Sequence, residues 1–299
     1  MGGYGWVERA LGGEWHSRIV VATMAVAATT FVTCFAVSAA GGTWWGGLTW
    51  PYISDTGREP PEAYVFGVGL TLASLLAAAS ATSQRRQLLL TKSWLVPVAI
   101  ESGSSGRSVC GCLPVSAMIT GGWLAHLAAL PFGITVGWVS TRTSIIVHFI
   151  GALGFFFFTL VAVACNTLAV GGLVRLGASW LYTSLVIKRV LFVCAAIAFV
   201  VHVVIGNIIV CESPNDDGVF DYRGCLAEQH VITVSQHAMV YLFLAILGTY
   251  ALDKLGLGEG TSYDSGSSPL ELSLSSEMSS DGRTQSAVVT SESDSSSST

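Results

Sequence analysis

The sequence contains little charge. Asp, Glu, Lys and Arg make up 11% of its 299 residues, whereas a soluble domain usually has about 25%. Hydrophobic residues make up 52%, and the mean hydropathy is +0.62. About half of the chain lies in long uncharged runs, each sufficient to cross a bilayer. The composition therefore excludes an ordinary soluble protein and indicates a polytopic membrane protein.

Acidic residues are missing from the middle of the chain, since none occurs between Glu101 and Glu212. Ion pumps and proton-coupled transporters usually place carboxylates within the membrane, so this absence disfavours those classes. The net charge of -5 arises after residue 254, where seven acids accompany one base. The rest of the chain is nearly neutral and has no basic face, so nucleic-acid binding is not expected. Neither a phosphate-binding glycine loop nor a nucleophile elbow is present.

Six apolar runs have the length of a membrane-spanning helix, about 20 residues or 30 Å. We therefore predict an all-α fold, a bundle of six transmembrane helices over residues 19–254, after a short N-terminal segment, 1–18. The first run is expected to act as a signal anchor. The run 88–100 is shorter and contains Lys92 and Pro97, so we interpret it as an interfacial segment within a loop. The predicted spans are 19–40, 63–82, 113–132, 144–165, 190–210 and 231–252.

The positions of Lys and Arg predict the orientation. The loops after the first, third and fifth spans contain only Arg58, Arg142 and Arg223, and most other bases lie in the remaining loops and terminal segments. This pattern places both termini in the cytosol and the three odd-numbered loops in a lumen or outside the cell. Lys188 and Arg189 are assigned to the loop after the fourth span.

The segment 255–299 differs from the rest, because it is rich in Ser with scattered acids. It has too little apolar surface to order itself, so we predict a disordered cytosolic tail. Acid-flanked serines predict phosphorylation and binding of protein partners. The alternative is a solvated spacer.

The loop after the first span combines aromatic and turn-forming residues. Trp44, Trp45, Trp50 and Tyr52 are expected at the level of the lipid headgroups. Turn-forming residues follow, and Pro61 with Glu62 suits the start of a helix. Two interpretations stay open. The loop is a rigid cap, or its acids Asp55, Glu59 and Glu62 also contact a ligand, a lipid or a partner.

A motif runs through this loop, consisting of Pro51, Tyr52, Ile53, Ser54, Asp55, Thr56 and Gly57, then Pro60, Pro61 and Glu62. It resembles the signature of the damage-regulated autophagy modulator (DRAM) family, within the wider Frag/DRAM/Sfk group that has a CWH-like N-terminal domain. Two weaker matches follow. One is His148 with Gly151 and Ala152, and the other is the spacing from Gln236 to Asp253, where Gln236 and His237 replace the family's usual Glu and aromatic residue.

The resemblance covers about residues 19–253. It implies a six-span protein of a lysosomal or other endomembrane that modulates autophagy non-enzymatically, through membrane lipids or protein partners. The plasma membrane and the Golgi are alternative locations. The group's link to lipid-anchor remodelling implies a second hypothesis, a lumenal-side lipid-modifying enzyme. A lipid transporter or scramblase is the third. The oligomeric state is left open.

The membrane histidines are the strongest chemical candidates. We predict a lumenal polar cluster of His126, His148, His202, Gln236 and His237. A b-type cytochrome needs histidine pairs towards both membrane sides, and a zinc enzyme needs three ligands with a base. The spacing supports neither, so no metal and no cofactor is predicted. The alternative is that these are buried hydrogen-bonding residues.

Cysteines provide two further candidates. Cys211 and Cys225 bracket the third odd-numbered loop, which predicts a disulfide in an oxidising compartment, with two free thiols as the alternative. Cys110 and Cys112 precede the third span on the predicted cytosolic side and are candidates for palmitoylation.

Overall fold

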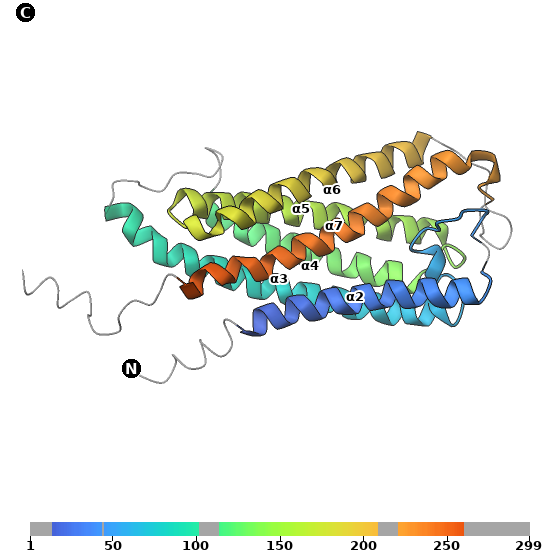
Figure 1. The fold of residues 1–299 in the computed structure, drawn as a ribbon, viewed down its shortest axis with the longest axis horizontal. Coiled ribbons are helices and arrows are strands. Elements are labelled where there is room, and N and C mark those ends of the chain that lie inside the picture. The colour runs from blue at the N-terminus through green and yellow to red at the C-terminus, as the bar shows by residue number, and fades with distance from the viewer. Residues whose placement is uncertain (1–13, 44, 102–113, 209–220, 260–299) are drawn as a thin grey trace, which may run out of the picture. The chain divides into compact units, whose positions relative to one another are not determined.

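The computed structural model describes residues 14–43, 45–101, 114–208 and 221–259. Over these residues it contains six long helices, three short 3-10 turns and no strand (Figure 1). All six helices are long and apolar enough to cross a membrane, which confirms the predicted all-α six-span fold. The helices are α2 (Glu14–Ala40), α3 (Glu62–Glu101), α4 (Val115–Trp138), α5 (Ile145–Arg175), α6 (Tyr182–Ile208) and α7 (Leu226–Glu259).

Helices α2 to α6, and α7 as far as Leu257, belong to one compact unit. Consecutive helices from α2 to α6 pack side by side and run in alternating directions (Figure 1). Helix α7 packs against α2 and α5, through a cluster in which Val20, Val163 and Ile246 are buried. We call the end of the bundle that holds the first loop, residues 41–61, the loop end, and the other the opposite end. Most of the predicted tail lies outside the described residues.

The turns that join the helices follow local chemistry. Ser144 caps α5, because its hydroxyl accepts a hydrogen bond from the backbone N–H of Val147. At the other end of α5, Gly177 has a φ of 110°, which glycine adopts without a Cβ clash. The turn η2 (Ser179–Leu181) then leads directly into α6.

Small residues allow the helices to approach closely, as in other membrane bundles. A Cβ added to Gly69 of α3 would lie 2.1 Å from Oγ1 of Thr30 on α2. A Cβ added to Gly154 of α5 would lie 2.5 Å from the ring of Phe132 on α4. A side chain at either position would collide with its neighbour. These two glycines therefore allow α2 to pack closely against α3, and α4 against α5.

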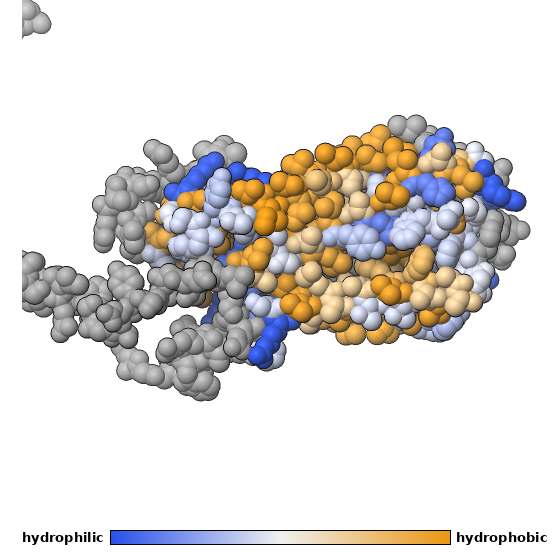
Figure 2. Space-filling view, in the orientation of Figure 1, coloured by the Kyte–Doolittle hydropathy of each residue, from blue (hydrophilic) through white to orange (hydrophobic). Residues whose placement is uncertain are grey.

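Apolar side chains also face outward. Val32, Leu72, Phe149 and Ile197 are among the large hydrophobic residues with exposed side chains. Figure 2 shows apolar side chains covering much of the visible face of the helices, with the strongly hydrophilic ones towards their ends. Such a surface is suited to lipid rather than to water.

Two sequence predictions about the loops are wrong. The run 88–100 belongs to α3 and is not an interfacial loop segment, because α3 continues to Glu101. The reason is tertiary packing, since Leu88 is buried in a cluster with residues of α4, α5 and α6. Lys188 and Arg189 lie within α6, which begins at Tyr182, and not in a loop.

Candidate functional site

The motif segment of the first loop is largely buried, although other parts of the loop, such as Trp50, are exposed. Its turn η1 (Asp55–Gly57) is entirely buried, and so are Arg58 and Glu62. The hydroxyl of Thr56 donates to the carbonyl oxygen of Ile53 at 2.7 Å, which closes the turn. The Pro60–Pro61 peptide bond is cis, and α3 begins directly after it at Glu62. The motif residues therefore form a folded plug.

Helix α7 holds this plug in place. The backbone N–H of Ile53 donates to Oε1 of Gln236 at 2.9 Å, and the hydroxyl of Tyr52 donates to Oε1 of Gln229 at 2.5 Å. Near the start of α7, the backbone N–H of Tyr222 donates to the carbonyl oxygen of Gly46 at 2.8 Å. Gln236 thus acts as the acceptor for a buried backbone N–H.

The acids of the first loop have partners within the chain. Arg58 lies 3.7 Å from Asp55 and 3.3 Å from Glu59. Arg142, from the connection between α4 and α5, reaches the other carboxylate oxygen of Glu59 at 2.7 Å. Glu62 accepts a hydrogen bond from the hydroxyl of Thr43 at 3.2 Å. These contacts fit the rigid-cap interpretation of the loop.

Burial raises the pKa of Asp55 to about 6, although the positive charge of Arg58 opposes the shift. The other ionisable groups that interact with Asp55 are the phenols of Tyr52 and Tyr222, whose pKa values are also raised by burial. An unfolded Asp titrates near 3.9, so between about pH 4 and pH 6 the folded protein binds more protons than the unfolded chain.

From this shift we expect the free energy of unfolding to fall as the pH rises from about 4 to 6, by an amount on the order of 2 kcal/mol. Above about pH 7 this contribution becomes constant. Asp55→Asn should remove this part of the pH dependence. The measurement is the denaturation midpoint of the purified protein and the variant from pH 4 to pH 8. Parallel curves for both proteins would show that Asp55 titrates normally.

The predicted lumenal histidines bond to backbone carbonyl oxygens. Nδ1 of His148 lies 2.6 Å from the carbonyl oxygen of Val139, and Nδ1 of His202 lies 3.3 Å from that of Ile232. Nδ1 of His237 lies 2.8 Å from the carbonyl oxygen of Thr233, which is on the same helix. A carbonyl oxygen only accepts, so each Nδ1 carries the proton and donates.

His126 does not join this group. Its Nε2 lies 3.0 Å from the hydroxyl of Tyr250, which is near the opposite end of α7. Helix α4 continues to Trp138, so His126 lies about 18 Å from the loop end of its own helix. His126 is therefore apart from His148 and Gln236, which both line a pocket next to the first loop. In the part of the chain that the structure describes, no three His, Cys, Asp or Glu side chains are placed to hold a metal ion.

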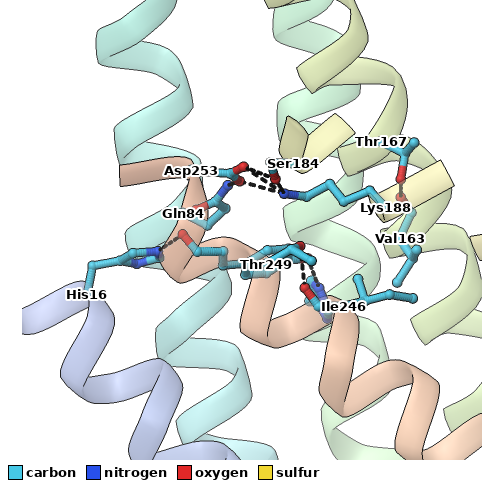
Figure 3. Close-up of polar contacts among 11 residues, drawn as sticks. His16, Gln84, Val163, Thr167, Ser184, Lys188, Ile246, Thr249 and Asp253 are labelled. Atoms are coloured by element: carbon cyan, nitrogen blue, oxygen red, sulfur yellow. Dashed lines mark hydrogen bonds and ion pairs between the residues drawn. The ribbon is translucent and has the colours of Figure 1, made fainter. Parts of the chain in front are cut away.

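A buried charged network, which the sequence did not predict, lies at the opposite end (Figure 3). Nζ of Lys188 lies 2.8 and 2.7 Å from the two carboxylate oxygens of Asp253. The hydroxyl of Ser184 and the side-chain amide of Gln84 donate to the same carboxylate, each at 2.5 Å. Lys188 is fully buried, with 0% of its surface exposed. The network joins α3, α6 and α7.

This network extends to α2. Nε2 of His16 lies 3.0 Å from the carbonyl oxygen of Tyr250, one turn before Asp253 (Figure 3). The ammonium of Lys188 also lies 5.4 Å from the centre of the Tyr250 ring, within the range of a cation–π contact. The one available sequence signal was the Asp at the end of α7, because an acid near a membrane span usually has a partner.

The predicted cysteine sites are only partly described. Cys225 is disulfide-bonded, but Cys211, its predicted partner, lies outside the described residues. Cys110 and Cys112 also lie outside them. Cys34, Cys165 and Cys194 are free.

A largely apolar pocket lies between the first loop and the helices. Its cavity volume is about 50 Å³. Ser54, His148 and Gln236 are its polar members. The remaining lining residues come from α2, α3, α4, α5, α7 and the loop, and they are Phe31, Ile53, Phe66, Leu70, Gly133, Val136, Ala152, Phe155, Phe156 and Val240.

Six apolar helices, a first loop with a buried turn and a charged network between the helices define a polytopic membrane protein. Residues 15–253 match the Frag1/DRAM/Sfk1/Cwh43P N-terminal domain. The chain belongs to this family, and the resemblance carried by the first-loop motif is confirmed. No curated protein and no solved structure matches the chain.

Proposed function

We propose that this protein modulates autophagy from a lysosomal or related endomembrane and acts non-enzymatically, through membrane lipids or protein partners. Its first loop would face the lumen and its termini the cytosol. Membership of the family that includes the DRAM proteins supports the setting. The observation that supports a non-enzymatic action is that the acidic side chains of the first loop and the backbone N–H of Ile53 bond to other groups of the chain.

A hydrolytic enzyme would need a base and a nucleophile or metal ligands around one substrate position. Here Asp55 and Glu59 are paired with Arg58, and His148 and His202 donate to backbone carbonyl oxygens. These contacts favour a structural use of the residues that the enzyme hypothesis would require. The proposal therefore ranks above the lipid-modifying alternative.

The test is autophagic flux in cells from which the gene is deleted and then restored. We expect flux to change on deletion and to recover with the wild-type protein. Recovery should fail with Gln236→Leu, which removes the acceptor for the Ile53 N–H. Ser235→Ala is the matched control, because the one bond of the Ser235 hydroxyl within the described residues is to the carbonyl oxygen of Ile232 on its own helix.

The location of a tagged protein and the lipid composition of the cells complete this test. We expect the protein on degradative compartments and an unchanged lipid composition in a His148→Ala/His202→Ala variant. Unchanged flux after deletion, with the protein located elsewhere, would contradict the proposal. Altered lipid species in the double variant would favour the enzyme hypothesis.

A further inference from the structure

A second cavity lies between four helices, next to the charged network at the opposite end. Gln84 and Arg85 of α3, His126 of α4, Asn166 of α5 and Tyr250 of α7 are among the residues that line it. Gln84 also belongs to the charged network, because its side-chain amide donates to Asp253 (Figure 3). The cavity volume is about 10 Å³, about the space that one water molecule needs. The cavity therefore has room for a single small molecule and not for a lipid.

Three of the lining side chains have a buried polar atom that lacks a hydrogen-bond partner among the described residues. These atoms are Oε1 of Gln84, Nε of Arg85 and Oδ1 of Asn166. Gln84 is 1% exposed and Asn166 is 9% exposed. A buried polar group without a partner is costly, so such groups usually bond to ordered water where the protein offers no partner. Their presence at one cavity points to a bound molecule.

The hydrogen-bonding role of each atom can be assigned. The carboxylate of Asp253 accepts only, so the NH₂ group of Gln84 is used there and its Oε1 is left as an acceptor. Nε of Arg85 carries a proton and only donates, and Oδ1 of Asn166 only accepts. If the Asn166 amide were turned over, it would present a donor, which a water molecule also binds. The cavity thus offers one donor and two acceptors.

This combination selects the ligand. A water molecule donates two hydrogen bonds and accepts others, and a buried water typically makes about three. An anion cannot donate to the two amide oxygen atoms. A metal cation would face the positive charge of Arg85, and no carboxylate lines the cavity to hold it. Water is the molecule that fits both the volume and the three polar atoms.

We propose that this cavity binds one ordered water molecule. The water donates to Oε1 of Gln84 and Oδ1 of Asn166, and it accepts from the Nε–H of Arg85. It bonds α5 to α3 and, through Gln84, to the Asp253 carboxylate on α7. Helix α5 thereby joins the buried network that otherwise connects α3, α6 and α7.

The test is X-ray radiolysis of the purified full-length protein in phosphatidylcholine nanodiscs, followed by mass spectrometry. The X-ray pulse converts a bound water into a hydroxyl radical, which modifies the side chains beside it. We expect modification of Tyr250, which lines the cavity and is 1% exposed. Met239 is the internal reference, because it is 0% exposed, does not line the cavity and is readily oxidised. Tyr250 that is no more modified than Met239 would overturn the proposal.

Three variants of α5 locate the water. Asn166→Leu removes one acceptor and places an apolar side chain at the cavity, so modification of Tyr250 should fall to the level of Met239. Asn166→Ser keeps a hydroxyl acceptor and should retain the modification. Thr167→Val is the matched control, because within the described residues the Thr167 hydroxyl bonds to the carbonyl oxygen of Val163 on its own helix.

Equal modification of Tyr250 in wild type and Asn166→Leu would place the water elsewhere and overturn the site. An equal loss in Asn166→Leu and Thr167→Val would also overturn it, because the loss would then follow a general change in packing. The comparison of Tyr250 with Met239 in the wild-type protein needs no variant, so misfolding of Asn166→Leu does not prevent the test.

Discussion

Replacing Lys188 with Met should lower the free energy of unfolding by about 3–5 kcal/mol, because it leaves the Asp253 carboxylate buried without its counter-charge. The Lys188 side chain is fully buried and contacts both carboxylate oxygens. Ser184 and Gln84 would still donate to Asp253, but two neutral donors replace only part of the effect of an ammonium ion. Met keeps the unbranched stem, so the loss reports the charge rather than the packing.

The measurement is unfolding of the purified protein in mixed detergent micelles, followed by circular dichroism. Arg189→Met is the matched control, since Arg189 is the next residue of α6, is exposed, and should tolerate the change within about 0.5 kcal/mol. The double variant Lys188→Met/Asp253→Leu should recover much of the loss, because no unpaired charge is left. Asp253→Leu is measured alone as well. If the double variant loses as much free energy of unfolding as Lys188→Met and Asp253→Leu lose together, the pair is not coupled.

The fold could largely be predicted from the sequence, because uncharged runs long enough to cross a membrane have few alternatives. The first-loop motif alone also carries the resemblance to the family. Both predictions depend on local information: the length of an apolar run or a short string of residues. The errors occur where a residue's environment is set by distant parts of the chain.

Lys188 shows this most clearly. A lysine between two apolar runs is typical of a loop, and the positive-inside rule reinforced that assignment. Its partner Asp253 lies 65 residues away and neutralises it inside the bundle. The start of α6 at Tyr182 therefore depends on a tertiary contact that periodicity and charge counts do not contain.

His126 was misplaced for a related reason. The third span was predicted over residues 113–132, from the length of an apolar run of about 20 residues. Helix α4 instead passes through Pro131 to Trp138, supported by close packing against α5 and α3. Prolines within membrane helices are tolerated when neighbouring helices provide that support. Because α4 extends six residues beyond its predicted end, His126 lies farther from the loop end than predicted. There it bonds to the hydroxyl of Tyr250.

Gly57→Ala should destabilise the first loop and lower the free energy of unfolding by about 1–3 kcal/mol through overpacking. A Cβ at this position would lie 2.4 Å from Cγ and 2.5 Å from Cβ of Phe66. Phe66 cannot move away easily, because its own Cβ is fixed by the backbone of α3 and its ring is buried against Cys34 and Ile53. Gly57 is therefore required for close approach to Phe66.

The control is Gly224→Ala in the turn η3 (Arg223–Cys225), where an added Cβ has no neighbour within 4 Å, and it should change stability by less than about 0.5 kcal/mol. The decisive comparison adds Phe66→Ala. Phe66→Ala alone is expected to be costly, because it empties a buried site. In that background, Gly57→Ala should cost little, because the atoms it would meet are mostly gone. A cost of Gly57→Ala that is the same with and without the Phe66 ring would show that another contact requires the glycine, and the same unfolding measurement distinguishes the two outcomes.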